Sequence, residues 1–197
     1  MPAKTDKKQC TRTALLQAGI DIMIQKGYAG TGIQEVLTSV SVPKGCFYHY
    51  FDSKEHFALE IIRYFDQGFT SEMLSVLQNT QRKPLDRLRD YCETTRRLAD
   101  DTNNGCPIAV LSHEMSAQSE VLRVELCDVL GRWRDAIAAC IVEGQSAGQI
   151  RTDCDARQLA EVFVSAWSGA KMRAKTSKSS EPTDAVLDVL IGRCLSP

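Results

Sequence analysis

The chain has 197 residues, a formal net charge of −1 and 43% hydrophobic residues, which is typical of one or two globular domains. The near-neutral charge argues against a protein that coats nucleic acid nonspecifically. No apolar run approaches the roughly 18 residues of a membrane span, and the opening MPAKTDKKQC has no apolar centre for a signal peptide. We therefore expect a cytoplasmic protein with no membrane partner.

Apolar residues recur at helical spacing throughout the chain, and no segment alternates as a half-buried strand would. The first helix is expected to end at Gly27, and Asn103-Asn104-Gly105 to interrupt the helix that starts at Pro84. The remaining predicted helices cover residues 53–79, 107–116, 122–141, 156–175 and 183–195. The predicted fold is all-α, with about nine helices.

The segment from residue 27 to residue 57 carries the clearest pattern. One apolar face marks a short helix at Ile33–Val40, Ser41–Pro43 forms a turn, and a second short helix spans Lys44–Tyr50. Ser53 then caps a third helix. This is the layout of a helix-turn-helix, which places its second helix in the major groove. The predicted partner is therefore double-stranded DNA.

The second short helix carries polar and aromatic residues around two anchors, Phe47 and Phe51, which we expect in the domain core. Gly45 disfavours a helix by about 1 kcal/mol, so close approach to a DNA groove is the better reason for it. Lys54 opposes the dipole of the helix that it opens, which indicates an external phosphate. The predicted DNA-binding residues are Thr31, Gly32, Lys44, Gly45, Cys46, Tyr48, His49, Tyr50 and Lys54.

Each of these residues has a simpler alternative role. Tyr48 could brace the core instead of touching DNA, and His49 alone would be read as a surface residue. Tyr50 and Lys54 fit phosphate contacts better than base reading.

Together these positions resemble the signature of the tetracycline-repressor (TetR) family. The matching residues are Gly27-Tyr28, Thr31-Gly32, Gly45, Tyr48-His49-Tyr50-Phe51 and Lys54-Glu55. The family's second threonine is Gly32 here, and its turn glycine is Ser41. The resemblance implies a basic flexible arm (1–8), a three-helix helix-turn-helix DNA-binding domain (9–56) and a C-terminal helical ligand-sensing and dimerisation domain (57–197). It also implies repression of an operator.

The last two predicted helices each carry an apolar stripe. In the TetR family the corresponding helices form a four-helix bundle across a two-fold axis, so the resemblance implies a homodimer that reads a palindromic operator. The alternative is that both stripes complete the core of a single chain. The predicted dimer-interface residues are Phe163, Trp167, Val186, Leu187, Leu190 and Ile191.

Eight cysteines are many for a cytoplasmic protein, yet none forms a Cys-x-x-Cys pair or lies near two histidines. We expect no metal site, no cofactor and no disulfide framework. Cys92, Cys140 and Cys194 lie on apolar stripes and are read as core hydrophobes. Cys106 differs, because Pro107 follows it and places it at a helix N-cap. A helix N-terminus lowers a thiol pKa and makes the sulfur nucleophilic.

Two segments around this cysteine resemble a branch of the family that senses reactive electrophiles and includes the repressor of N-ethylmaleimide reductase. They run from Gly105-Cys106-Pro107 to Leu111-Ser112 and from Trp167–Ala170 to Ser180–Pro182. The resemblance implies that Cys106 responds to reactive carbonyls, quinones or oxidants, and that the repressor then leaves its operator. Lys175 would favour the thiolate if it lay nearby. The alternative is a packed capping thiol and a solvated lysine.

Three other functions stay open at this point. The inducer could be a noncovalent apolar or aromatic small molecule in the C-terminal domain. A thiol-dependent enzyme is disfavoured, because the three histidines show no His–acid partnership with Cys106, and we assign no catalytic residue. A helical adaptor would have no operator at all.

Overall fold

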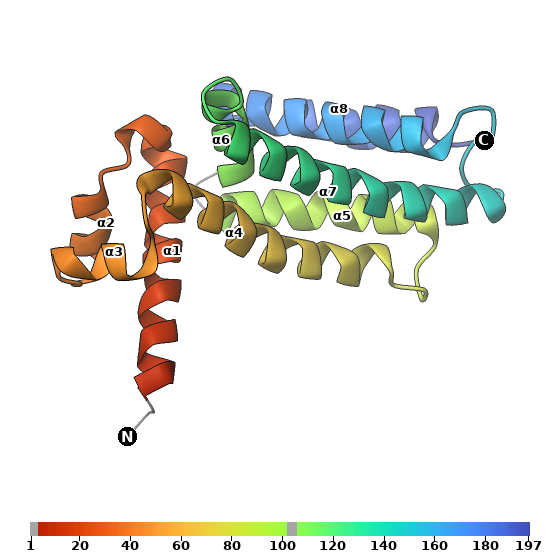
Figure 1. Cartoon of the computed structure of the whole chain (residues 1–197). Helices are drawn as coiled ribbons and strands as arrows, with labels where there is room; N and C mark the ends of the chain where they lie inside the picture. Colours follow the sequence, from red (N-terminus) through yellow and green to blue (C-terminus); the bar gives the residue numbers. More distant parts are fainter. Residues whose placement is uncertain (1–3, 102–105) are drawn as a thin grey trace. The chain divides into compact units, whose positions relative to one another are not determined.

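The computed structural model describes residues 4–101 and 106–197, and within these ranges every regular element is helical (Figure 1). The all-α prediction is confirmed. The chain divides into two compact units, residues 1–68 with 105–129 and residues 69–104 with 130–197. Two long helices, α4 (Lys54–Leu77) and α7 (Glu120–Ser146), contribute residues to both units. None of the described helices combines the length and the hydropathy that crossing a bilayer requires.

The first unit contains the predicted helix-turn-helix together with α6. Its elements are α1 (Lys4–Gly30), α2 (Ile33–Ser39), a 3₁₀ turn (Lys44–Cys46), α3 (Phe47–Tyr50), the start of α4, α6 (Pro107–Met115) and the start of α7. Because α1 begins at Lys4, helix replaces much of the arm predicted for residues 1–8. Residues 103–105, where we expected a helix break, lie outside the described part of the chain.

The α1 helix loses helical geometry at the residue where the sequence predicted its end. Gly27 has φ 74° and ψ 176°, although the helix resumes and continues to Gly30. Gly19 marks a close contact earlier in α1, because a Cβ there would lie far inside contact distance of the Phe57 ring. The core between α1, α2, α3 and α4 is almost entirely apolar. Its fully buried members include Leu15, Leu16, Met23, Val36, Leu37, Phe47, Phe51, Phe57 and Ile61.

The segment predicted as one helix from Lys44 to Tyr50 is a 3₁₀ turn followed by a single turn of α-helix. Pro43, with extended backbone, precedes it, and the Cys46 N–H bonds to the Pro43 carbonyl at 2.9 Å, three residues back. A chain this short is held by its buried phenylalanines more than by helix propensity. Ser41 adopts the left-handed conformation, with φ 54°, in the turn before it.

The second unit packs its helices around one apolar core. It contains the end of α4, α5 (Pro84–Asp101), the rest of α7, α8 (Ala156–Ser177), α9 (Glu181–Ala185) and a π-helix (Val186–Cys194). The last predicted helix, over 183–195, is thus a short α-helix that continues with π-helical hydrogen bonding. The core residues include Leu88, Cys92, Ile137, Cys140, Ile141, Phe163, Trp167 and Ile191.

Candidate DNA-binding and thiol sites

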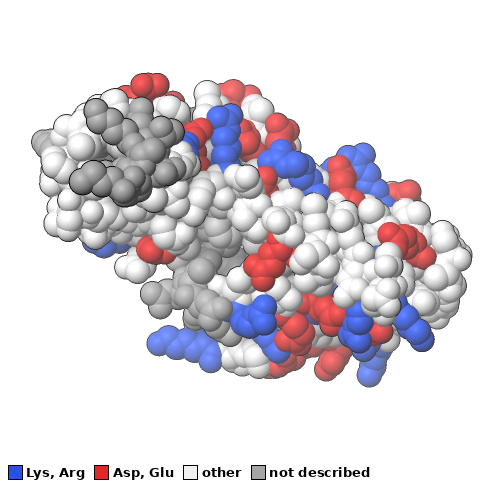
Figure 2. Space-filling view, turned by 90° about the horizontal axis from the view of Figure 1, so that it is seen from below, with Lys and Arg blue, Asp and Glu red and all other residues white. Residues whose placement is uncertain are grey.

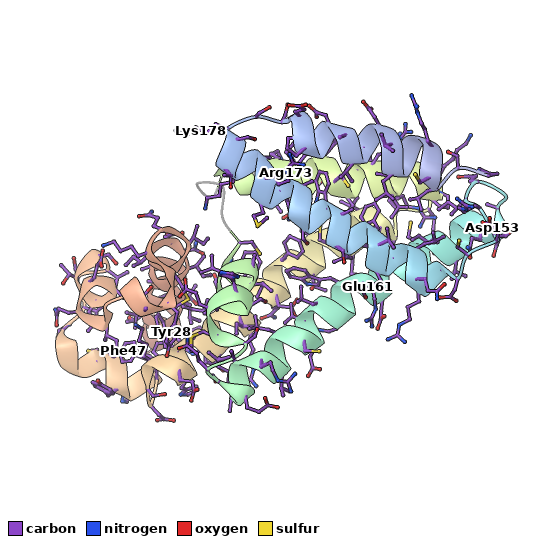
Figure 3. The ribbon with its side chains drawn as sticks, turned by 90° about the horizontal axis from the view of Figure 1, so that it is seen from above. Tyr28, Phe47, Asp153, Glu161, Arg173 and Lys178 are labelled. Atoms are coloured by element: carbon purple, nitrogen blue, oxygen red, sulfur yellow. The ribbon has the colours of Figure 1, made fainter. Side chains whose placement is uncertain are left out.

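An aromatic cluster fixes the reading segment, which we define as residues 44–50. The ring centroid of Phe47 lies 5.3 Å from that of Phe51 and 5.2 Å from that of Phe57, and all three side chains are buried. Figure 3 labels Phe47 among the helices of the first unit. The prediction that Phe47 and Phe51 anchor this segment is confirmed. The opposite side of the segment is therefore left to solvent.

The residues that face outward from this cluster are those a major groove could accept. Tyr48 is 61% exposed, so it does not brace the core. Gly45 and His49 are exposed, while Cys46 and Tyr50 are half-buried. A Cβ at Gly45 would meet no atom within 4 Å, so nothing inside the protein requires glycine there. The backbone of Lys44 belongs to the 3₁₀ turn, but its side chain lies outside the described part of the structure.

Thr31 does not have the role that the sequence predicted. It is only 2% exposed, and its hydroxyl donates to the Gly27 carbonyl at 2.7 Å. The hydroxyl closes the turn between α1 and α2, so it is not available to a DNA phosphate. Gly32 is exposed and forms the N-cap of α2, with its carbonyl accepting from the N–H groups of Glu35 and Val36.

Lys54 is also engaged within the protein. Its Nζ lies 4.7 Å from the centroid of the Tyr28 ring and donates to the Ala29 carbonyl at 3.3 Å. Burial lowers the pKa of Lys54, and the nearby Glu114 carboxylate opposes that shift. Ser53 caps α4 as predicted, because its hydroxyl accepts from the His56 N–H at 2.9 Å. Lys54 thus braces the turn between α1 and α2 from the start of α4.

Glu114 is the contact residue that the sequence did not reveal. Its Oε2 accepts a hydrogen bond of 2.7 Å from the Tyr28 N–H, which lies 86 residues away in the sequence. The only local signal was Gly27, whose left-handed backbone leaves the following N–H without a helical partner. No periodicity in α6 could have paired this carboxylate with that N–H.

Cys106 has the N-cap position of α6 that the sequence predicted, with Pro107 at the first helical position. Its side chain is half-buried, and its carbonyl accepts from the Val110 N–H at 3.2 Å. Lys175 is exposed in the last turn of α8. Cys106 belongs to the first compact unit and Lys175 to the second.

Two other thiols are packed into the core, as their apolar stripes predicted. Burial raises the pKa of Cys92 far above its usual value and that of Cys140 to about 11. The Cys140 sulfur also lies 3.4 Å from the Pro84 carbonyl. Cys194, which the sequence assigned to the core as well, is exposed. The described cysteines therefore differ widely in their access to reagents.

Three of the predicted dimer-interface residues are core residues of the single chain. Phe163, Trp167 and Ile191 are at most 2% exposed. Val186, Leu187 and Leu190 are partly buried against the same core. The apolar stripes that the sequence identified on the last two predicted helices therefore pack within their own chain. The exposed apolar residues nearby are Val162, Met172 and Val189.

The second unit carries a mixed surface. Figure 3 shows Glu161 and Arg173 along α8, with Asp153 before its start and Lys178 at its end. Figure 2 shows lysine and arginine interspersed with aspartate and glutamate on the face that it displays. Among residues 4–101 and 106–197, no group of three His, Cys, Asp or Glu side chains is placed to hold a metal ion.

A short exposed reading segment, anchored by buried aromatics and preceded by α2 and a turn, defines a helix-turn-helix DNA-binding protein. Residues 15–61 match the family model "Bacterial regulatory proteins, tetR family", and residues 84–190 match "Tetracyclin repressor-like, C-terminal domain". The chain belongs to the TetR family of transcriptional regulators. Members of this family are DNA-binding regulators, so the prediction that the protein is not an enzyme is confirmed.

Known relatives extend over nearly the whole chain. The HTH-type transcriptional repressor DhaR of Mycobacterium sp. (strain GP1) is 33% identical over 91% of this chain and 89% of its own length. The HTH-type transcriptional repressor NemR of Escherichia coli K12 is 32% identical over 90% of each chain. The crystal structure of the reduced form of E. coli NemR matches with a TM-score of 0.84, 28% identity and coverage of 95% of this chain and 97% of that one.

Proposed function

We propose that the protein is a homodimeric repressor that places its two reading segments in successive major grooves of a palindromic operator. The exposed Gly45–Tyr50 side of the reading segment supports this role, and so does its similarity to the repressors DhaR and NemR. A palindrome presents two identical half-sites, which a two-fold symmetric protein matches. Because the proposed partner is an operator, we expect the protein to work in the cytoplasm, where the DNA is.

The second copy is proposed to pack on the outer face of α8. Val162, Ala166 and Gly169 lie at i, i+4 and i+7, on a face turned by roughly 100° from that of the buried Phe163 and Trp167. A Cβ at Gly169 would meet no atom of its own chain, which leaves room for a close approach of another helix. Val189 on the π-helix adds a further exposed apolar side chain. Such faces are natural sites of association.

The inducer is proposed to be a reactive electrophile or oxidant that acts on Cys106. The observation that carries this proposal is the position of Cys106 at the N-cap of α6, directly before Pro107. The sulfur of Cys106 would add to an activated carbonyl or alkene carbon, so that a C–S bond forms, the π bond of that carbon breaks, and its electron pair takes up the thiol proton. The related E. coli NemR was crystallised in a reduced form, which agrees with thiol chemistry in that relative.

The adduct must change the relative stability of two conformations of the protein. A difference of about 3 kcal/mol between them is enough to lower operator affinity by about two orders of magnitude. The adduct is proposed to displace α6 and α4, and thereby to change the separation of the two reading segments.

The test is DNA binding by the purified protein to the intergenic DNA upstream of its own gene, with and without methylglyoxal or a quinone. The proposal predicts specific binding that the electrophile abolishes. Cys106→Ser should keep the binding and lose the response. Cys127→Ser removes an exposed thiol elsewhere in the same unit, and this control should respond like the wild type.

Other outcomes separate the remaining functions. Binding that ignores every electrophile but is relieved by an apolar or aromatic compound indicates a noncovalent inducer. Release that persists in Cys106→Ser excludes Cys106 as the sensor. Affinity for DNA that shows no sequence preference contradicts the operator-binding function itself.

A further inference from the structure

The turn between α1 and α2 depends on a side chain from α6. At Gly27 the backbone of α1 leaves helical geometry, so the Tyr28 N–H cannot bond to the carbonyl four residues earlier. Instead it donates to Oε2 of Glu114 at 2.7 Å. An N–H bond to a carboxylate is stronger than one to a neutral acceptor. Glu114 therefore supplies the hydrogen bond that the kink removes.

The same carboxylate occupies the space that a side chain at Gly27 would need. A Cβ on Gly27 would lie far inside contact distance of Oε1 of Glu114. The positive φ favours glycine at this position, and a side chain there would have to push the Glu114 carboxylate, the flexible end of its side chain, away from the Tyr28 N–H. The absence of a side chain at Gly27 therefore gives the Glu114 carboxylate room to reach the Tyr28 N–H.

Two further hydrogen bonds hold the turn between α1 and α2 in place. The Thr31 hydroxyl donates to the Gly27 carbonyl, and the Lys54 ammonium donates to the Ala29 carbonyl while lying over the Tyr28 ring. Two residues separate Gly30 from α2, which begins at Ile33, and a four-residue turn joins the end of α2 to the reading segment. A displacement of Tyr28 consequently changes where α2 starts.

The α6 helix connects this turn to Cys106. It has nine residues, with Cys106 at its N-cap and Glu114 in its last turn, about 12 Å away along the axis. Pro107, Ile108, Leu111 and Met115 are buried along one side of this short helix, so a displacement at its start would be passed to its last turn. Both α6 and the helix-turn-helix belong to the first compact unit.

We propose that Glu114 is a positioning residue for DNA binding, which holds the turn between α1 and α2 to α6. Resting on the proposed function, a change at Cys106 reaches the reading segment when α6 withdraws the Glu114 carboxylate from the Tyr28 N–H. Ser119 reinforces the connection, because its hydroxyl donates to Oε1 of Glu55 in the first turn of α4 at 2.6 Å. Glu114 itself need not touch DNA.

The experiment compares Glu114→Ala, Glu114→Gln and Glu120→Ala in the full-length protein. Glu114→Ala removes the acceptor, and Glu114→Gln keeps an amide oxygen in its place. Glu120 is an exposed glutamate of the same unit that pairs with Arg123, which makes it the matched control. Two readouts are measured in each protein: operator affinity, and hydrogen exchange of the Tyr28 amide.

We expect Glu114→Ala to lose about tenfold or more in operator affinity and to expose the Tyr28 amide to exchange by a similar factor. Glu114→Gln should restore most of both, and Glu120→Ala should change neither. Methylglyoxal added to the wild type should also release the Tyr28 amide. If Glu114→Ala fails to fold, Glu114→Gln and the methylglyoxal exchange measurement still decide the matter.

Unchanged protection of Tyr28 in a folded Glu114→Ala protein would overturn the inference. Electrophile that releases the operator while Tyr28 stays protected would overturn the route through Glu114 and leave sensing at Cys106 intact. Conversely, a Glu114→Ala defect rescued by glutamine supports the positioning role, even where no electrophile acts on the wild type. The failures of the two proposals are thus distinguishable.

Discussion

The indole Nε1 of Trp167 donates a hydrogen bond of 2.8 Å to the Thr95 hydroxyl, and both side chains are buried. The Thr95 hydroxyl donates in turn to the Cys92 carbonyl at 3.0 Å. This chain of bonds ties α8 to α5 within one subunit. It assigns one face of α8 to the core of the chain, and the exposed Val162 lies outside that face.

Trp167→Phe should destabilise the fold without affecting association. The change removes the indole donor to Thr95 and leaves a gap beside Phe163, at a cost of about 1–3 kcal/mol in the free energy of unfolding. Urea unfolding measures that cost, and sedimentation measures the oligomeric state. A weakened dimer with unchanged unfolding would show that Trp167 belongs to the interface after all.

Val162→Glu should weaken association of the two copies and leave the stability of the fold nearly unchanged. Val162 is 55% exposed in the single chain, so a carboxylate there costs little folding free energy, but it would be buried unpaired between two copies. We expect the dissociation constant of the dimer to rise by about tenfold or more, with operator affinity falling in parallel. Val121→Glu, at an equally exposed valine of α7, is the control. Equal effects of the two changes would refute the proposed α8 interface.

Gly45→Ala should separate DNA binding from stability. No protein atom lies near the added methyl group, and alanine favours helical backbone by up to about 1 kcal/mol, so the protein should be as stable as the wild type or more so. Operator affinity should nevertheless fall, because the methyl group would meet the groove. Gly68→Ala in α4 adds a methyl group to equally open space and should leave operator binding unchanged. Full operator affinity in Gly45→Ala would contradict close approach of the backbone at residue 45 to the DNA groove.

Alkylation of the native protein should distinguish the cysteines. With a pKa of about 11, Cys140 has about one thiolate in a thousand at pH 8, and burial suppresses the thiolate of Cys92 even further. Iodoacetamide at pH 8, followed by peptide mass spectrometry, should modify Cys106 while sparing both. Labelling of Cys140 should grow as the pH rises toward 11. Equal labelling of all three cysteines would mean that the folded core opens readily.

Ser41→Gly should stabilise the protein. Ser41 adopts φ 54°, where a Cβ costs roughly 1 kcal/mol that glycine avoids, and the TetR signature has glycine in this turn. Urea unfolding should show a gain of about that size, reduced by the greater freedom of glycine in the unfolded chain. Ser39→Gly, at the last residue of α2, should destabilise, because it places glycine at the helix end and removes the hydrogen bond from the Ser39 hydroxyl to the Val36 carbonyl. If Ser41→Gly lowered the free energy of unfolding as much as Ser39→Gly, the inference of backbone strain at Ser41 would be wrong.

Local chemistry was enough to predict much of the DNA-binding site. The N-cap of Ser53, the anchors Phe47 and Phe51 and the N-cap of Cys106 each depend on residues within one or two turns, so the sequence pattern contains them. The expected helical geometry of Lys44–Tyr50 was less accurate. In so short a segment the buried phenylalanines and Pro43 outweigh helix propensity.

Contacts between distant segments could not be predicted in the same way. The threonine at position 31 follows the family signature, but its burial depends on how the turn folds back onto Gly27. Glu114 meets Tyr28 only because α6 packs beside α1. For α8, periodicity identified an apolar face but could not say whether that face covers its own chain or a second one.

The first unit is assembled from two stretches of chain, residues 1–68 and 105–129, with α5 lying between them in the sequence but belonging to the other unit. A single genetic crossover after α3 would therefore combine the helix-turn-helix of one regulator with the α6 of another. The residue at the position of Glu114, from one regulator, would then have to fit the Gly27 kink of the other. Exchange of the helix-turn-helix between such proteins should accordingly succeed between close relatives, whose α1 and α6 fit each other. It should fail between distant relatives.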